Sequence, residues 1–433
     1  MSTLAAVTLW GTTIGAVALE DDAVTAAFQY DRAFLRSDIQ VAPLMMPLSE
    51  RIHLFPALSP GSFHGLPGLL ADSLPDRFGN ALIDAWLARQ GRTPQSFNAV
   101  ERLCYTGTRG MGALEFLPAT GPKPGPSTRL DVERLVALAS DILSRRGELH
   151  GDLTPEAGAD ALQVILRVGT SAGGARAKAL IAWHPETNEV RSGQVDVGGG
   201  FQHWLLKFDG VTSNRDRELV DPLGYGAIEY AYYRMATDCG ITMSPCRLLA
   251  EGPRRHFMTR RFDRTPDGGK LHMQSLAALA HLDFSEAGAN SYEQAFEVTR
   301  RLGIPTEAGE ELYRRMVFNV VARNQDDHVK NIAFLMDRRG AWSLAPAYDM
   351  TWAYQPDGRW TSSHQMTVNG KRGDFTQRDL EAAGRAASLK RGRARRILGE
   401  VRETVGAWRR YAEEAGVAPD RARMIQDTLR LDL

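Results

Sequence analysis

The stretch N-Q-D-D-H-V-K-N at residues 324–331, followed by A-P-A-Y-D at residues 345–349, decides the fold of this 433-residue chain. Between the two motifs lie two short apolar runs separated by a turn at 338–340, a pattern that predicts a β-hairpin. A hairpin brings the residue before its first strand beside the residue after its second. We therefore expect Asn331 and Asp349 to lie together at one open end of the hairpin.

The residue types gathered there indicate a chemistry. Asp326 precedes Asn331 by five positions, so its carboxylate can face both Asn331 and Asp349. An amide oxygen and a carboxylate form a hard, oxygen-only site that suits Mg²⁺ bound to phosphates, and a further carboxylate can take a proton from a hydroxyl. The same spacing occurs in the catalytic loop of protein kinases, where a metal-binding Asp follows later. Taken singly, each residue is only a turn former, and their combination favours function.

A glycine-rich segment, G-T-S-A-G-G-A-R-A-K at 169–178, lies between the apolar runs 162–168 and 179–183. We interpret it as a strand–turn–strand element. Its glycines would let backbone N–H groups approach phosphate oxygens, with Arg176 or Lys178 adding positive charge. The alternative is a structural turn, because most glycine-rich hairpin turns bind nothing.

Lys207 is the single cation in the apolar run H-W-L-L-K-F. Its place after the glycine-rich segment is where a kinase carries the lysine for its α- and β-phosphates, and Glu229 on the following predicted helix is a candidate ion-pair partner. The alternative is an edge-strand lysine whose head group reaches water.

Two other motifs are weaker indications of function. H-G-D-L at 150–153 resembles a phosphotransferase loop, but Ala157 stands where a metal-binding Asn is required, so we interpret it as a loop. Asp326, Asp327 and His328 together suggest a metal hydrolase, but the additional ligands that such a site needs are not spaced nearby.

Composition excludes several classes of protein. The 52 Lys and Arg residues cancel the 52 Asp and Glu residues, so no global field attracts nucleic acid or a membrane surface. A content of 43% hydrophobic and 24% charged residues is typical of a soluble globular protein. The uncharged stretch 1–19 contains glycines and hydroxyl residues and lacks a preceding cation, so we expect neither a membrane span nor a signal peptide. Cys104, Cys239 and Cys246 form no CxxC pair, which favours a reduced, cytoplasmic protein.

The organisation along the chain follows turn signals and apolar periodicity. G-P-K-P-G-P at 121–126 predicts a linker. The patterns predict strands at 5–19, 28–44, 201–208, 247–249 and 256–262. They predict helices around 82–87, from Thr128 onward, from Ile228 to a stop at Gly240, from Leu312 to Arg323, and through most of the chain after Leu276.

In this order and over nearly the whole chain, the pieces resemble the HipA family of bacterial toxin kinases. The resemblance rests on S-L-P-D-R-F-G (73–79), the glycine-rich segment, the Lys207 strand, R-R-F-D-R (260–264) and the two motifs quoted first. It implies an α+β fold: a bilobal protein-kinase-like domain, with a β-rich N-lobe and an α-helical C-lobe, preceded by a β-rich N-terminal subdomain. The expected bounds are 1–120 for the N-terminal subdomain, 128–265 for the N-lobe and 266–433 for the C-lobe.

The resemblance also implies roles for individual residues. Asp326 would be the catalytic proton acceptor, and Asn331 and Asp349 would hold Mg²⁺. Residues 260–262 would form the hinge against adenine, and Asp263 would either reach the ribose or belong to a structural salt-bridge cluster. The implied ATP-binding residues are Gly173, Gly174, Ala175, Arg176, Ala177, Lys178, Lys207, Arg260, Arg261, Phe262, Asp263, His328, Asn331, Tyr348 and Asp349.

Some members of the family autophosphorylate a serine in the glycine-rich loop and thereby switch themselves off. Ser171 matches that position, and the alternative is a turn serine without a regulatory role. The sequence departs from the family pattern at Asp327, which adds a negative charge beside the proton acceptor, and at Arg260, where an acidic hinge residue is expected.

The implied function is that of an ATP- and Mg²⁺-dependent serine/threonine protein kinase, the toxin of a toxin–antitoxin system. Its substrate would be a protein such as an aminoacyl-tRNA synthetase. A helix-turn-helix antitoxin of HipB type would bind it and carry it to operator DNA. We interpret the basic run at 390–396 as a solvated helix face, with a contact to the DNA backbone as the alternative.

Two other functions stay open: a catalytically silent, kinase-shaped partner of an antitoxin or repressor, and a small-molecule phosphotransferase. Retention of all four expected site residues favours the enzyme, because a silent relative usually loses at least one. These residues are Lys207, Asp326, Asn331 and Asp349.

Overall fold

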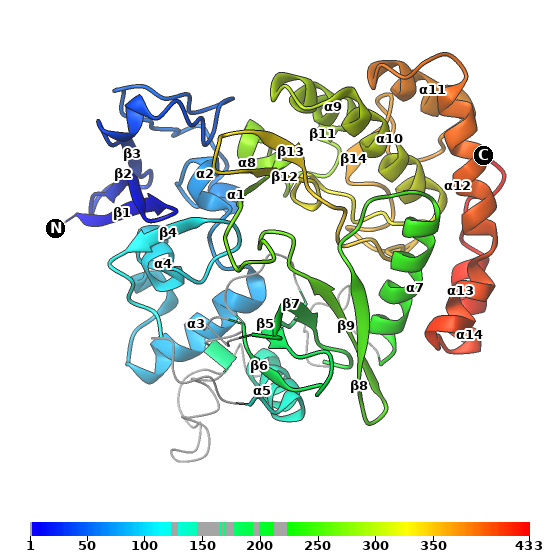
Figure 1. The fold of residues 1–433 in the computed structure, drawn as a ribbon, viewed down its shortest axis with the longest axis horizontal. Helices are drawn as coiled ribbons and strands as arrows, with labels where there is room; N and C mark the ends of the chain where they lie inside the picture. Colours follow the sequence, from blue (N-terminus) through cyan, green and yellow to red (C-terminus); the bar gives the residue numbers. More distant parts are fainter. Residues whose placement is uncertain are drawn as a thin grey trace.

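The computed structural model describes residues 2–122, 129–144, 165–166, 169, 176–193, 199–211 and 223–433. Within these residues, three large hydrophobic cores correspond to an N-terminal subdomain, a β-rich lobe and a helical lobe. In Figure 1 the strands of the N-terminal subdomain are blue to cyan, the sheet of the β-rich lobe is green, and the helices in the core of the helical lobe run from green (α7, Tyr225–Asp238) to red (α14, Pro419–Gln426). The expected α+β fold with a β-rich N-lobe and an α-helical C-lobe is confirmed.

The N-terminal subdomain is built on a four-stranded antiparallel sheet with the order β3-β2-β1-β4. The predicted strand–turn–strand at 5–19 is confirmed as β1 and β2. The predicted strand at 28–44 is wrong beyond Tyr30, because the chain then turns and buries Phe34 and Val41 from a non-β backbone. The elements are β1 (Thr3–Leu9), β2 (Thr12–Leu19), β3 (Ala27–Tyr30), η1 (Phe34–Arg36), α1 (Pro60–Phe63), α2 (Gly68–Ala71), α3 (Arg77–Arg89), η2 (Pro94–Ser96), α4 (Ala99–Thr106) and β4 (Leu114–Leu117).

The N-lobe holds a five-stranded antiparallel sheet with the order β6-β5-β7-β9-β8. Its strands and helices are α5 (Val132–Ser144), β5 (Lys178–Trp183), β6 (Val190–Ser192), β7 (Gln202–Lys207), α7 (Tyr225–Asp238), β8 (Cys246–Glu251) and β9 (Arg254–Arg260). Helix α3 packs against α5 and shares the hydrophobic core of this sheet, although it precedes the predicted linker. The expected bounds 1–120 and 128–265 therefore divide the chain but do not separate its cores.

One predicted strand of the N-lobe is wrong. Ile165 and Leu166 are helical, and the Gly169 amide donates a hydrogen bond to the Ile165 carbonyl at 2.8 Å. The strand–turn–strand interpretation of 169–178 therefore keeps only its second strand, β5. A short apolar run does not distinguish a buried strand from a buried helical turn by its periodicity.

The C-lobe is mainly helical, as expected. Its helices are α8 (Leu276–Ala280), α9 (Tyr292–Arg301), α10 (Thr306–Val321), η4 (Val329–Asn331), α11 (Gln377–Ala386), α12 (Arg393–Gly406), α13 (Trp408–Ala415) and α14 (Pro419–Gln426). Its strands are β10 (His272–Ser275), β11 (Asn290–Ser291), β12 (Ala333–Met336), β13 (Trp342–Leu344) and β14 (Met366–Thr367). The predicted hairpin is confirmed as β12 and β13, with Phe334 opposite Leu344. No helix in the described part of the chain is long and apolar enough to cross a membrane.

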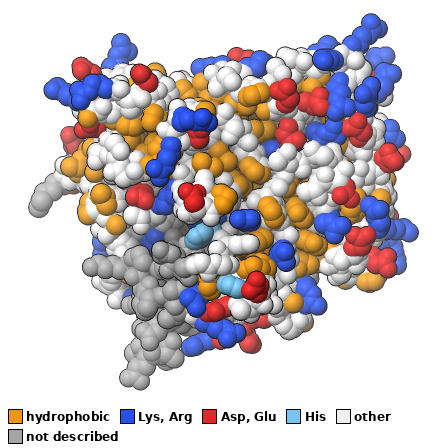
Figure 2. All heavy atoms as spheres, viewed as in Figure 1, with side chains coloured by type: hydrophobic (Ala, Val, Ile, Leu, Met, Phe, Trp, Pro, Cys, Tyr) orange, Lys and Arg blue, Asp and Glu red, His pale blue; other side chains and the backbone are white. Residues whose placement is uncertain are grey.

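The basic run at 390–396 lies at the start of α12. Figure 2 shows Lys and Arg side chains gathered at the upper right, where Figure 1 places α11 and α12. Part of this charge is paired within the chain: Arg393 lies 2.6 Å from Glu310, and Arg395 lies 3.0 Å from Glu381. The apolar face of α12 is buried, so the run forms the solvated side of a packed helix.

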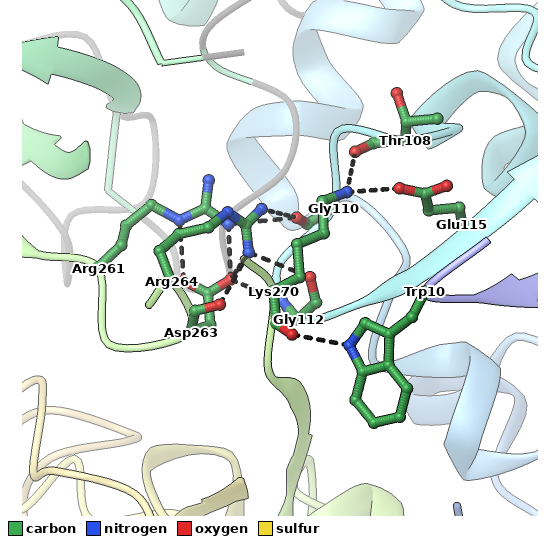
Figure 3. A network of polar contacts seen from close by, with 9 residues as sticks. All are labelled: Trp10, Thr108, Gly110, Gly112, Glu115, Arg261, Asp263, Arg264 and Lys270. Atoms are coloured by element: carbon green, nitrogen blue, oxygen red, sulfur yellow. Dashed lines mark hydrogen bonds and ion pairs between the residues drawn. The ribbon is translucent and has the colours of Figure 1, made fainter. Parts of the chain in front are cut away.

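A buried carboxylate joins the N-terminal subdomain to the segment that follows β9 (Figure 3). Asp263 is 0% exposed and accepts hydrogen bonds from Arg261 at 2.6 and 2.9 Å and from Arg264 at 2.7 Å. The backbone N–H of Gly112, two residues before β4, donates a further hydrogen bond to it at 2.7 Å. Arg261 also donates to the Gly110 carbonyl at 3.3 Å. The carboxylate is therefore fully used in a structural contact.

Lys270 makes a second contact across the same boundary. Its ammonium group lies 2.7 Å from the Glu115 carboxylate and 2.9 Å from the Thr108 carbonyl. The Trp10 indole donates to the Lys270 carbonyl at 2.7 Å (Figure 3). The N-terminal subdomain is thus held to the hinge region by several polar contacts.

Removing the charge of Asp263 should destabilise the protein, because it leaves Arg261 and Arg264 without their buried counter-ion. We expect Asp263→Asn to lower the free energy of unfolding by about 3–5 kcal/mol in urea denaturation. The arginines hold the pKa of Asp263 well below its usual range, against the opposing effect of burial. The deficit should therefore persist at neutral pH and shrink only below about pH 4, where the unfolded wild type takes up the proton.

Asp267→Asn is the matched control, because Asp267 is exposed a few residues away. Its stability should stay within about 0.5 kcal/mol of the wild type. Equal stabilities of the two variants would contradict the structural role of Asp263.

Candidate active site

The loop that carries Asp326 is fixed by the end of α10 and by the chain after Asp349. The Gln325 amide donates to the Ala353 carbonyl at 3.0 Å, and the Asn324 side chain donates to Asn319 at 2.9 Å. A weaker bond at 3.3 Å joins Asn324 to the Asp349 carbonyl. The two predicted motifs therefore lie side by side.

The side chain of Asn331 is hydrogen-bonded to the backbone of Asp326. The side-chain nitrogen Nδ2 of Asn331 donates to the backbone carbonyl of Asp326 at 2.8 Å. The side-chain oxygen Oδ1 of Asn331 therefore points away from that bond. No hydrogen bond from a described residue reaches this amide oxygen. The Asp326 side chain is 41% exposed, which leaves its carboxylate accessible to a substrate.

Asp349 lies just beyond the hairpin, with a backbone φ of +54°. Residues other than glycine rarely adopt this left-handed backbone conformation. Strained backbone of this kind is common at functional sites. Its carboxylate lies 2.5 Å from the ammonium group of Lys207 on β7. The same ammonium group lies 2.5 Å from Glu229 on α7. The structure therefore contains the predicted Lys207–Glu229 pair and adds Asp349 to it.

The charges of these groups depend on one another. Burial disfavours the charge of Lys207, but the carboxylates of Asp349 and Glu229 together raise its pKa. Burial likewise opposes the ionisation of Asp349, yet Lys207 and Lys178 hold its pKa below the usual value. Both groups are thus charged at neutral pH.

Asp326 behaves differently. Burial raises its pKa, and repulsion from Asp349 and Asp327 adds to the rise against the opposing effects of His328 and Trp360. The two carboxylates thus influence each other, and hydrogen bonds from Asn324 to the Asp349 carbonyl and from Tyr348 to the Lys330 carbonyl join the segments that carry them. A raised pKa favours uptake of a proton, which is what a general base requires.

The glycine-rich segment is only partly described. Ser171, Gly173, Gly174 and Ala175 lie outside the described residues. Arg176 lies 3.5 Å from Glu229 and stacks over the Tyr225 ring at 4.0 Å, which places its charge beside the Lys207 cluster.

Lys178 is the first residue of β5 and Ala177 directly precedes it, and both are buried. Lys178 lies 3.0 Å from Asp76, and both side chains are at most 5% exposed. Asp76 also caps α3 by accepting a hydrogen bond from the Gly79 amide at 2.6 Å. The S-L-P-D-R-F-G motif therefore anchors the strand that follows the glycine-rich segment.

The hinge residues separate into two groups. Phe262 and Tyr348 pack their rings 5.7 Å apart beside the hairpin, and the Tyr348 hydroxyl donates to the Lys330 carbonyl at 2.5 Å. Arg260 is the last residue of β9, and the Arg261 backbone N–H extends the pairing by donating to the His203 carbonyl at 2.9 Å. The oxygens of Asp263 are occupied as described above, so the structure favours the salt-bridge alternative over a contact with ribose.

His328 stands beside the proposed base. Its Nε2 atom lies 3.8 Å from the Asp326 carboxylate, and its ring lies between those of Phe284 and Trp360. It also contributes to the lowered pKa of Asp349.

Sequence reasoning missed the role of Asp327. Its carboxylate is buried and accepts hydrogen bonds from Tyr292 at 2.9 Å and from the Gln365 amide at 2.8 Å. His364 contacts it at 2.8 Å. These partners hold the pKa of Asp327 below its usual value despite burial. Asp327 therefore anchors the catalytic loop, and its partners are too distant in sequence for any spacing pattern to reveal them.

Sequence reasoning also missed Trp360, whose indole N–H donates to Asp326 Oδ1 at 2.6 Å. Trp360 follows the second motif in a segment without periodicity, so no pattern marked it.

The donor set fits a Mg²⁺ ion bound together with phosphates. Among the described residues, no cluster of three or more His, Cys, Asp or Glu side chains forms a closed metal cage. The Asn331 amide oxygen and the Asp349 carboxylate would hold such an ion and would leave its remaining positions to water and phosphate oxygens, as Mg²⁺ prefers. Lys207, beside Asp349, adds the positive charge that phosphates require.

Comparison with known proteins identifies the family. Residues 170–408 match the HipA-like C-terminal domain, and residues 5–117 match the HipA N-terminal domain. The chain belongs to the HipA family. The two matched regions contain every residue of the site described above.

Individual relatives agree with this assignment. The chain is 27% identical over 411 residues to a Sinorhizobium fredii protein named "Putative kinase Y4mE", covering 90% of this chain and 80% of that protein. A second protein of that organism, "Putative kinase Y4dM", is 28% identical over 176 residues, covering 39% of this chain and 41% of that protein. The fold is similar to that of HipA in the Shewanella oneidensis complex of HipA, HipB and operator DNA, with a TM-score of 0.66, 16% identity, and coverage of 98% and 94% of the two chains.

Removing the Asp327 carboxylate should loosen the catalytic loop. We expect Asp327→Ala to lower the free energy of unfolding by about 3 kcal/mol, because it leaves buried donors of Tyr292 and Gln365 without an acceptor. Hydrogen exchange of the Gln365 amide should also accelerate, as mass spectrometry of the peptide that contains it would show.

Asp357→Ala serves as the control, because Asp357 is exposed on the same loop as Trp360. It should leave stability and exchange at Gln365 unchanged. Wild-type protection in Asp327→Ala would refute the anchoring role.

Proposed function

We propose that this member of the HipA family is an ATP- and Mg²⁺-dependent serine/threonine protein kinase that acts as the toxin of a toxin–antitoxin system. The observation that carries the proposal is the convergence of Lys207, Glu229 and Asp349, and the hydrogen bond by which Asn324, on the loop that carries Asp326, contacts the Asp349 carbonyl. Phosphoryl transfer depends mainly on positioning and charge stabilisation, and these four side chains supply both.

In this proposal each side chain has one task. Lys207, oriented by Glu229, binds phosphate oxygens of ATP. Asp349 and Asn331 hold Mg²⁺, which offsets the negative charge that develops on the phosphates. Asp326 accepts the proton of the attacking hydroxyl, for which its raised pKa and exposure suit it. Phe262 and Tyr348 offer an apolar wall for the adenine ring.

The proposal extends to partners. The acceptor is a protein hydroxyl, with an aminoacyl-tRNA synthetase as the family's expected substrate class, and Ser171 is the proposed site of autophosphorylation. The Shewanella oneidensis relative was solved with HipB and operator DNA, which supports a HipB-type antitoxin as the partner of this chain. We further propose that the protein works in the cytoplasm and meets DNA only through that antitoxin.

Loss of the base should abolish transfer. We expect Asp326→Ala to reduce the rate of γ-phosphate transfer from labelled ATP by about 10²–10⁴-fold, because proton transfer by a positioned base contributes that much. The rate would be measured with casein as a generic protein acceptor and by label on the chain itself. Asp357→Ala, on the exposed loop nearby, should retain wild-type activity.

A wild type that transfers no phosphate to either acceptor would favour the catalytically silent binding protein. Transfer to small hydroxyl compounds alone would favour the small-molecule phosphotransferase.

The metal dependence of nucleotide binding tests Asp349. We expect Asp349→Ala to weaken ATP binding in Mg²⁺ by about tenfold, because it removes a metal ligand and the counter-charge of Lys207. Calorimetric titration with and without Mg²⁺ would show the wild type gaining affinity from the metal and the variant gaining little. An unchanged Kd in Mg²⁺ would remove Asp349 from the metal site.

A further inference from the structure

The loop between Asp349 and β14 makes hydrogen bonds to two adjacent residues of the catalytic loop, Asp326 and Asp327. Asp326 accepts the hydrogen bond from the Trp360 indole, and Asp327 accepts one from the Gln365 amide. The Gln365 side chain in turn donates to the carbonyls of Trp360 and Ser363. The position of Trp360 is thus set by its own loop and by the residue next to Asp326.

The contact with Trp360 is selective for one oxygen of the carboxylate. Both the indole N–H, at 2.6 Å, and His328 Nε2, at 3.8 Å, approach Oδ1 of Asp326. Among the described residues, no hydrogen bond reaches Oδ2. Because the side chain is 41% exposed, Oδ2 is the atom left for an incoming hydroxyl.

We propose that Trp360 is a positioning residue, which fixes Oδ1 of Asp326 so that Oδ2 accepts the proton of the acceptor hydroxyl. This inference rests on the proposed function. The indole is well suited to the task, because it is a donor only and its rigid ring fixes the direction of the bond. A hydrogen bond to a charged carboxylate is also stronger than one between neutral groups.

The role of Asp327 follows from this arrangement. A carboxylate beside the base would by itself repel it. Here its oxygens are also occupied by Tyr292, His364 and Gln365, so in addition to repelling Asp326 it holds the loop that presents Trp360.

The contact itself is tested without activity. In the full-length protein, the ¹⁵N-indole resonance of Trp360 is identified by its absence from the spectrum of Trp360→Phe. Asp326→Asn, which replaces the charged acceptor by a neutral one, should move this resonance strongly and leave the other indole resonances in place. A Trp360 resonance that does not respond to Asp326→Asn would overturn the proposal.

The consequence for the reaction is tested by kinetics. Trp360→Phe keeps an aromatic ring but removes the donor. We expect its kcat for phosphate transfer from ATP to casein to fall about tenfold, because a misplaced catalytic group loses rate without losing substrate affinity. The KM for ATP should remain within about twofold of the wild type, since no hydrogen bond or ring contact among the described residues joins Trp360 to Lys207, Glu229 or Asp349.

Trp342→Phe is the matched control, because it also removes an indole donor, the one to the Gln40 carbonyl at 3.2 Å, away from the site. It should keep the wild-type kcat. A Trp360→Phe variant with wild-type kcat would refute the positioning role while leaving the kinase assignment intact. If the wild type transfers no phosphate, the proposed function fails, and the indole resonance alone decides whether Trp360 holds Asp326.

Discussion

One ammonium group, that of Lys207, joins the two lobes. It reaches Glu229 on α7 and Asp349 beyond the hairpin, both at 2.5 Å. Its side chain is 12% exposed, and a buried charge costs several kcal/mol unless it is paired. The two carboxylates together outweigh the effect of burial and raise the pKa of the lysine. The two ion pairs of Lys207 therefore hold the lobes in their relative position and also balance the charges of the site.

The two neighbouring aspartates of the catalytic loop show how environment divides chemically identical groups. Asp327 is surrounded by donors and its pKa lies below the usual value, whereas the pKa of Asp326 is raised by burial and by nearby carboxylates. A pair of groups whose environments separate their pKa values in this way is typical of a site with distinct structural and chemical roles. The sequence places the two side by side, but only the fold distinguishes them.

The sequence predicted those parts of the fold that depend on near neighbours. The hairpin at 332–346 and the amphipathic helix before it follow from short-range periodicity, and they alone bring Asn331 towards Asp349. The strand expected at 162–168 failed because a short apolar run fits a helical turn equally well. The strand expected at 28–44 failed beyond Tyr30 because loop side chains were buried as effectively as strand residues.

The site residues divide along the same line. Glu229, the partner of Lys207, was predicted because the strand with Lys207 and the helix with Glu229 follow the glycine-rich segment in the same order as in a kinase. The partners of Lys178 and Asp263 were not, because Asp76 and Gly112 precede them by a long stretch of chain and carry no periodic signal. Both partners belong to the part of the chain before the linker.

The N-terminal subdomain thus contributes directly to the structure of the N-lobe. Helix α3 contributes Phe78 and Leu82 to the core of the N-lobe sheet, and Asp76 at its start fixes the first residue of β5. Gly112 fixes the carboxylate that orders the hinge. A protein that lost these residues would leave the buried Lys178 without its counter-ion Asp76 and the buried Asp263 without the Gly112 N–H, at a cost of several kcal/mol. The N-lobe is therefore incomplete without the chain that precedes it, and the subdomain and kinase-like region form one structural unit.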